Sequence, residues 1–225
     1  DISDYYDINP EFGTMADVDR LIAEAKKRDM YVIMDLVINH TSDEHAWFQE
    51  ALKDPQSPYR DYYIFKEGKD GHAPTNWRSV FGGSVWEPVP GEDNMYYFHA
   101  FAKKQPDLNW ENPKMRQNIY QMINFWLEKG IAGFRVDAIN FMKKNQDWPD
   151  GKPDGADGLS ACFPFSRNVP GIEVFFKELR ENTFDRYQCF TVAEAVGVAY
   201  DKLDIFIGDT GCFNMLFDFS YANLD

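Results

Sequence analysis

Cysteine is scarce in this sequence, and long apolar runs are absent from it. Its three cysteines, Cys162, Cys189 and Cys212, are widely separated, which argues against a disulfide framework and a zinc-type CxxC pair. Such a pattern is typical of a reducing compartment, so we expect a cytoplasmic protein. No apolar stretch approaches the roughly 18 residues that a membrane-spanning helix needs, and none reads as a signal peptide. We therefore expect no membrane partner for this chain.

Positive charge is also in short supply. The sequence has 23 lysines and arginines against 37 aspartates and glutamates, which gives a formal net charge of −14. An acidic surface repels a phosphate backbone, so we expect no nucleic-acid partner. Neither GxGxxG nor GxxxxGK[ST] occurs in the chain, and their absence argues against a nucleotide site.

The common metal-binding spacings are missing as well. His40 and His45 do not have the spacing of an HExxH zinc site. Asp154 and Asp157 could suggest calcium, but they do not fit the EF-hand loop, so a solvated loop is favoured. We expect no catalytic metal and no cofactor.

Aromatic side chains, in contrast, are abundant. They make up 16% of the residues, within a hydrophobic share of 44%, and this composition indicates a folded chain of 225 residues with one sizeable core. Aromatic faces can bind sugars or bases, and the negative charge disfavours bases. The composition is therefore compatible with a carbohydrate ligand.

Apolar, β-branched runs alternate with helical patterns along the chain. The runs that we expect to be strands are residues 30–39, 131–139, 189–196 and, less distinctly, 213–219. Helical stripes precede the first three, with Thr14 and the Asn112-Pro113 pair as N-terminal signals and Gly130 as a stop. This alternation predicts βα units and a parallel sheet.

One connection is far longer than the others. About 70 residues separate the first expected strand from the helix that starts near Pro113, whereas an ordinary βα loop has about 2–6. The stretch is rich in Trp, Tyr, Phe, Gly and Pro. We expect a small subdomain, residues 41–104, inserted between 1–40 and 105–225.

Polar residues gather near the C-terminal ends of the expected strands. They are Asp35, Asn39 and His40 on the first, Arg135 and Asp137 on the second, and Glu194 on the third. In a barrel of βα units, active sites are built at this end of the strands. In an open α/β sheet it is also the ligand end.

Two of these carboxylates suggest acid–base chemistry on a sugar. Arg135 and Asp137 point to one side of the sheet, and the guanidinium is expected to keep Asp137 ionised. If the second and third strands are neighbours, Asp137 and Glu194 can come within the about 5–5.5 Å typical of a retaining glycosidase. Asp137 would then be the nucleophile, and Glu194, in an apolar run near a like charge, the acid and base. The alternative is an Arg–Asp ion pair that only organises a core.

Four ordered motifs resemble the α-amylase superfamily: "DLVINH" (35–40), "QPDLNW" (105–110), "GFRVDAINF" (133–141) and "TVAEA" (191–195). The stretches "DISDYYDINPEFGTM" and "NHTSDEHAWFQEA" are similar to its oligo-1,6-glucosidase and α-glucosidase branch. The resemblance implies an α/β fold that is a partial TIM (β/α)8 barrel, from about the third to the sixth strand. It also implies that the insertion after the third strand is subdomain B.

The resemblance implies roles for several residues. Asp137 would be the nucleophile, Glu194 the acid/base, and Arg135 the residue that holds the nucleophile. His40 would hydrogen-bond the sugar in subsite −1, with Gln105, Phe101 and Phe81 as further lining residues. Each has an alternative: His40 as a core histidine, Gln105 as a turn residue, and the two phenylalanines as subdomain core. Asp35 is expected to be a partner of Arg135 rather than a catalyst.

The function implied is that of a retaining exo-α-glucosidase acting on short α-glucosides of the maltose and isomaltose type. The alternatives are a sucrose isomerase or trehalose-type glucosyltransferase, or a catalytically silent, transporter-associated member. Ala138 stands where isomaltose-preferring members commonly carry valine, which implies acceptance of α-1,4 linkages. A third carboxylate of the family would lie beyond Asp225, so we expect residues 1–225 alone to be inactive. We expect this segment either to self-associate through unpaired strand edges or to exist only within, or alongside, the rest of its polypeptide.

Overall fold

The computed structural model describes residues 1–219, and the chain divides into two compact units. Unit 1 comprises Asp1–Ser3, Ile38–Met115 and Asn140–Ile172. Unit 2 comprises the remaining segments, which begin at Asp4, Arg116 and Glu173. In the described part of the chain, no helix is long and apolar enough to cross a membrane.

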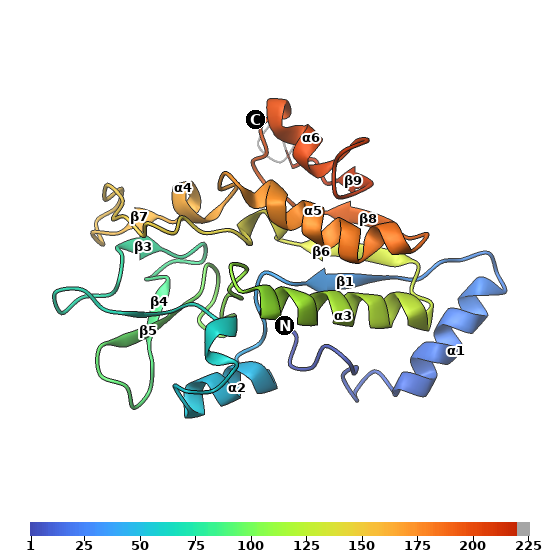
Figure 1. The fold of residues 1–225 in the computed structure, drawn as a ribbon, viewed down its shortest axis with the longest axis horizontal. Helices are drawn as coiled ribbons and strands as arrows, with labels where there is room; N and C mark the ends of the chain where they lie inside the picture. The colour runs from blue at the N-terminus through green and yellow to red at the C-terminus, as the bar shows by residue number, and fades with distance from the viewer. Residues whose placement is uncertain (220–225) are drawn as a thin grey trace. The chain divides into compact units, whose positions relative to one another are not determined.

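Unit 2 contains a parallel sheet of four strands, shown in Figure 1. Its order is β1-β6-β8-β9, so strands that follow one another along the chain as βα units are also neighbours in space. The bounds are β1 Ile33–Val37, β6 Gly133–Asp137, β8 Phe190–Ala193 and β9 Met215–Leu216. The predicted parallel sheet, and the predicted pairing of the second and third strands, are confirmed.

Three long helices precede the first three strands. They are α1 (Met15–Lys26), α3 (Pro113–Lys129) and α5 (Ile172–Asn182), as the apolar periodicity predicts. Short turns of helix complete the C-terminal region: η3 (Phe184–Arg186), η4 (Tyr200–Lys202) and α6 (Leu203–Phe206). The alternation of helix and strand therefore continues through the described part of the unit.

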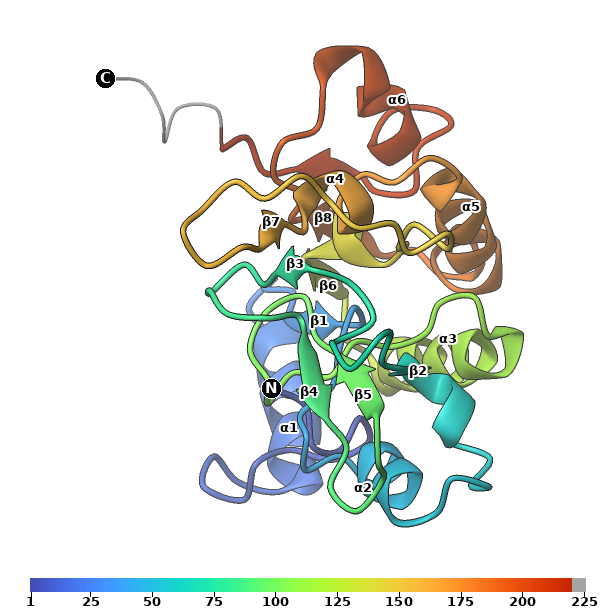
Figure 2. The same ribbon diagram turned by 90° about the vertical axis from the view of Figure 1, so that its left-hand side faces the viewer.

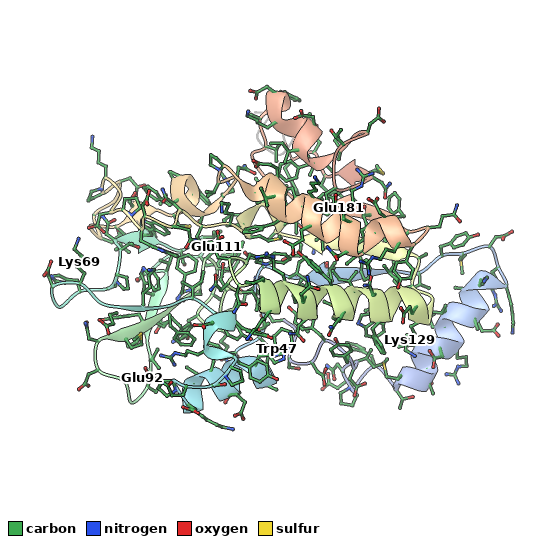
Figure 3. All side chains as sticks on the ribbon, in the orientation of Figure 1. Trp47, Lys69, Glu92, Glu111, Lys129 and Glu181 are labelled. Carbon is green, nitrogen blue, oxygen red and sulfur yellow. The ribbon has the colours of Figure 1, made fainter. Side chains whose placement is uncertain are left out.

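Local sequence fixes where the helices begin and how two of them are joined. Thr14 and Asp17 form a capping box at the start of α1, and the Asn112 side chain accepts hydrogen bonds from the backbone at the start of α3. At the other end of α3, the ammonium of Lys129 (labelled in Figure 3) lies 2.5 Å from the carboxylate of Asp19 on α1. The caps and this ion pair set the ends of the helices that cover the sheet.

The last strand is shorter than the apolar run 213–219 predicts. Asn214 accounts for the N-terminal limit of the strand, because its side chain takes the place of a backbone ladder bond. Its Oδ1 accepts from the backbone N–H of Thr191 at 2.8 Å, and its own N–H donates to the Thr191 hydroxyl at 3.1 Å. Regular pairing to β8 therefore begins at Met215, and β9 comprises Met215–Leu216.

Unit 1 is built around short antiparallel strands, seen most clearly in Figure 2. Its three-stranded sheet has the order β2-β5-β4, and a separate parallel pair joins β3 to β7. The bounds are β2 Phe65–Glu67, β3 Trp77–Arg78, β4 Trp86–Pro88, β5 Met95–Phe98 and β7 Ser160–Ala161. The helical elements are α2 (Ala46–Lys53), η1 (Arg60–Tyr62) and α4 (Phe163–Ser166), and η2 (Ile139–Phe141) starts at the boundary with unit 2.

Residues 140–172 pack on the predicted insertion, a feature that the sequence analysis did not anticipate. Trp77 is completely buried and stacks on Trp148 and Phe165. The guanidinium of Arg78 binds the carboxylates of Asp154 and Asp157, each at 2.5 Å. The predicted segment 41–104 therefore lies in a larger compact unit, and the two aspartates considered for calcium are held by an arginine.

Gly133 is expected to be essential for the pairing of β6 with β8. Its φ of +153° favours glycine, and a Cβ at this position would overlap the backbone carbonyl of Phe190. Gly133→Ala should lower the free energy of unfolding of the full-length protein by about 3 kcal/mol or more. Gly208→Ala is the matched control, because Gly208 also has positive φ but open space around it, and its cost should be about 1 kcal/mol. Equal denaturation curves for the two variants would contradict this account.

Candidate active site

The register of β1 and β6 aligns two rows of side chains on the same face of the sheet. Asp35 lies opposite Arg135, and two residues further along Val37 lies opposite Asp137. Because side chains alternate across a strand, Arg135 and Asp137 emerge on the same side. The intervening Val136 is completely buried on the other side. The arrangement follows directly from the apolar–polar alternation in the strand.

Glu194 is held immediately beside the end of β6. Its backbone N–H donates to the carbonyl of Val136 at 2.8 Å, and its carbonyl accepts from the N–H of Ile139 at 3.1 Å. The backbone N–H and the carbonyl of Glu194 are thus both hydrogen-bonded to the segment that contains Asp137. Adjacent strands are about 4.8 Å apart, so the two carboxyl groups start from neighbouring positions.

Arg135 contacts all three carboxylates at this edge of the sheet. Its Nη1 lies 2.6 Å from Asp35 Oδ1 and 2.8 Å from Asp137 Oδ1, while its Nη2 contacts Glu194 Oε2. The arginine side chain is 30% exposed, and the three carboxylates lie on β1, on β6 and directly after β8. One guanidinium therefore connects β1, β6 and β8.

The charge of Arg135 is secured by its surroundings. Partial burial acts to lower the pKa of Arg135, but the hydrogen bond and charge of Asp35 and those of Asp137 outweigh it, so the net pKa is raised. The guanidinium consequently stays positive at every pH at which the protein would work. It provides a fixed cation between a potential nucleophile and a potential proton donor.

In unit 1, His40 and Gln105 meet at one carboxylate. His40 is buried, and its Nε2 lies 3.3 Å from Asp1 Oδ1 and 3.3 Å from Gln105 Nε2. Gln105 donates to the same Asp1 oxygen at 2.8 Å, and its own Oε1 accepts from the N–H of Ala102. The two polar residues predicted for sugar binding are thus in direct contact with each other.

Phenylalanine rings extend this group in unit 1. The ring of Phe101 is centred 5.7 Å from that of His40 and 4.9 Å from that of Phe141. Phe81 joins the group through Phe101, at 5.8 Å, and is 71% exposed. Phe101 is therefore central to the aromatic group, and Phe81 lies at its exposed margin. Phe141 belongs to "GFRVDAINF", but the sequence analysis did not single it out.

Two charged residues of the network around Asn39 and His40 were not predicted from the sequence. Asp107, in "QPDLNW", and Lys144 form an ion pair of 2.7 Å, and both are buried. The acidic residue inside a motif was a signal for Asp107, but nothing distinguished Lys144 from the adjacent Lys143. Within residues 1–219, no group of three or more His, Cys, Asp or Glu side chains could hold a metal ion.

Comparison with known proteins identifies relatives along the whole chain. The family model "Alpha amylase, catalytic domain" matches residues 1–225. A probable oligo-1,6-glucosidase 3 of Bacillus subtilis (strain 168) is 50% identical over 226 residues, covering 100% of this chain and 40% of the relative. An oligo-1,6-glucosidase of Halalkalibacterium halodurans is 47% identical over 228 residues, with the same coverage.

Solved structures share the fold. The crystal structure of trehalose-6-phosphate hydrolase from Bacillus licheniformis has a TM-score of 0.89 and 44% identity, covering 97% of this chain and 39% of its own. Isomaltulose synthase from Klebsiella sp. LX3 has a TM-score of 0.88 and 40% identity, covering 96% of this chain and 38% of its own. The chain thus spans about 40% of the length of these relatives.

The predicted fold class agrees with these findings. The parallel strands of unit 2 and the helices between them correspond to part of a TIM barrel, and the described strands form an open sheet rather than a closed barrel. The family model covers every residue, and several oligo-1,6-glucosidases are more than 40% identical along the entire chain. The chain belongs to the alpha-amylase catalytic domain family, and within it to the oligo-1,6-glucosidase branch.

Proposed function

We propose that the full-length protein carrying this chain is a retaining exo-α-glucosidase that hydrolyses short α-glucosides through a covalent glycosyl-enzyme intermediate. The observation that carries the proposal is the contact of Arg135 with both Asp137 and Glu194 at adjacent strand ends. Relatives named oligo-1,6-glucosidase support an activity on α-glucosides. Release of glucose from a disaccharide, with the α-anomer as first product, is the direct test.

The proposed reaction has two steps that use the same pair of carboxyl groups. In the first, Asp137 attacks the anomeric carbon, the glycosidic bond breaks, and Glu194 protonates the departing oxygen. In the second, Glu194 takes a proton from water, which attacks the same carbon and releases Asp137 from its ester. Two inversions leave the product with the configuration of the substrate. Arg135 orients Asp137 and offsets the negative charge around it.

We further propose that His40 and Gln105 hydrogen-bond the hydroxyl groups of the glucose unit in subsite −1. Phe101 provides an apolar face for the sugar ring, and Phe81 adds a further wall. The contact between His40 and Gln105 and the aromatic neighbours of Phe101 support this reading. The ligand class that fits these groups is a small neutral oligosaccharide.

Transglycosylation is the second candidate activity. Solved structures at 40–41% identity are named trehalulose synthase and isomaltulose synthase. The glycosyl ester on Asp137 is the same in both reactions, and only the acceptor differs. Analysis of the products from sucrose distinguishes the two. A catalytically silent, transporter-associated role is disfavoured, because the chain retains Asp137, Glu194 and Arg135.

Replacement of Arg135 tests the cation at the centre of this arrangement. Arg135→Gln in the full-length protein should lower kcat by about 100-fold or more, because the carboxylates lose their orienting partner. Arg20→Gln, at an arginine whose side chain is 76% exposed, should leave kcat unchanged. Equal kcat values for the two variants would refute the role of Arg135.

Replacement of Glu194 tests the proton donor. Glu194→Gln should reduce turnover of a disaccharide far more than that of a nitrophenyl glucoside, whose good leaving group needs little protonation. Steady-state kinetics with the two substrates measures the difference. Equal losses on both substrates would remove the acid role from Glu194.

The residue after the proposed nucleophile tests the linkage preference. Ala138 has a φ of +42°, and its side chain is smaller than the valine common in isomaltose-preferring members. We expect acceptance of α-1,4 linkages, and Ala138→Val should shift the ratio of kcat/KM values toward isomaltose by about 10-fold, because one small apolar group is worth about 1–3 kcal/mol. A wild-type preference for isomaltose over maltose of tenfold or more would contradict this expectation.

A further inference from the structure

Unit 1 contains an ion pair that is almost completely shielded from solvent. The ammonium of Lys144 lies 2.7 Å from Asp107 Oδ2, and the two side chains are 1% and 0% exposed. Burying two charges costs several kcal/mol per ion before their attraction is counted, and apolar residues often stabilise a core equally well. Neither residue has a part in the proposed chemistry. The pair therefore calls for an explanation other than stability.

The ammonium has an oxygen partner for each of its three N–H groups. Besides Asp107, Lys144 donates to Asn39 Oδ1 at 3.1 Å and to the carbonyl of Phe141 at 2.5 Å. A lysine can only donate hydrogen bonds, so the atom of Asn39 that faces it must be the carbonyl oxygen. Lys144 thereby fixes which way round the Asn39 amide lies.

The fixed orientation of the Asn39 amide determines whether His40 Nδ1 donates or accepts a hydrogen bond. Asn39 Nδ2 donates to Asp107 Oδ2 at 3.1 Å and lies 3.2 Å from His40 Nδ1. An amide nitrogen has only hydrogens to offer, so Nδ1 must accept. In the neutral ring the proton is then on Nε2.

The contacts at the other side of the ring agree with this tautomer. His40 Nε2 lies 3.3 Å from Asp1 Oδ1, a carboxylate oxygen that can only accept. Gln105 Nε2 also donates to that oxygen, which explains why two nitrogens lie 3.3 Å apart without bonding to each other. Both ends of His40 consequently indicate a proton on Nε2.

We propose that Lys144 is a positioning residue which, acting through Asn39, holds His40 in the neutral Nε2–H tautomer. When sugar binds, His40 donates its Nε2–H to a sugar hydroxyl oxygen in place of Asp1 Oδ1, and it cannot accept there. This inference rests on the proposed function for the sugar-binding role of His40. The tautomer itself rests only on contacts within unit 1.

The tautomer is measurable by 15N NMR of the full-length protein labelled at histidine, with the His40 signals assigned by their loss in His40→Gln. In the wild type, Nε2 should give a pyrrole-like signal and Nδ1 a pyridine-like signal. Lys144→Met removes the ammonium, so the Asn39 amide is free to turn and His40 should show both tautomers. The kcat/KM for a disaccharide should fall by about tenfold, the value of one hydrogen bond.

Two further variants make the test specific. Lys143→Met is the matched control, because the adjacent Lys143 pairs with Glu111 and is outside the network, so signals and kinetics should be those of the wild type. Lys144→Met leaves Asp107 buried without its cation and can prevent folding, so Asn39→Asp provides an independent test. An ionised aspartate at this position accepts from Lys144 but cannot donate to Nδ1, so Nδ1 should gain a proton and lose its pyridine-like signal.

Three outcomes test the positioning role of Lys144 separately from the proposed function. A wild-type spectrum with Nδ1 protonated overturns the inference. Unchanged His40 signals in Asn39→Asp and in folded Lys144→Met also overturn it. If the signals change as expected but the full-length protein has no glucosidase or transglycosylase activity, the positioning role of Lys144 is supported and the proposed function fails.

Discussion

The contact of Arg135 with three carboxylates is the interaction on which the rest of unit 2 depends. Asp35 and Asp137 lie on adjacent strands and Glu194 directly after the next one, and without a cation their charges would repel one another. Two carboxylates about 5 Å apart repel by about 3 kcal/mol at an effective dielectric constant of about 20. Arg135 offsets that repulsion because its guanidinium attracts each of the carboxylates. The sheet can therefore keep acidic groups together at its carboxyl edge.

The geometry of that contact is set by the backbone. The register of β1 with β6 places Asp35 opposite Arg135, and the two backbone bonds of Glu194 fix it beside β6. Close approach of β6 and β8 requires a glycine at position 133. Unit 1 uses a related device, in which a buried lysine orients an amide rather than a carboxylate. In both units a cation orients the polar side chains around it.

Much of unit 2 could be predicted because its signals are local. Apolar periodicity, the Thr14 cap and the Pro113 start identify the helices, and β-branched runs identify the strands to within a few residues. Parallel βα order then implies that the second and third strands are neighbours. The residue at which β9 begins was not predictable, because it depends on a side-chain hydrogen bond between Asn214 and Thr191.

The arrangement of unit 1 could be predicted only in part, since its decisive contacts join residues far apart in the sequence. Stacking of Trp77 on Trp148 and Phe165 attaches residues 140–172 to the insertion, and no periodicity in the sequence predicts such a contact. Likewise, two adjacent lysines look alike in the sequence, yet one is 18% exposed and the other 1%. Motif resemblance indicated His40 and Gln105, but not the network behind them.

The central claim is that Asp137, held by Arg135, forms a covalent bond to the sugar. Its most direct test is mass spectrometry of peptides from the full-length protein after inactivation with a fluorinated α-glucosyl fluoride, which slows breakdown of a glycosyl ester. The account predicts one added fluoroglucosyl group, located on Asp137 and absent in Asp137→Asn. A label on another carboxylate, or complete inactivation without any covalent adduct, would contradict it.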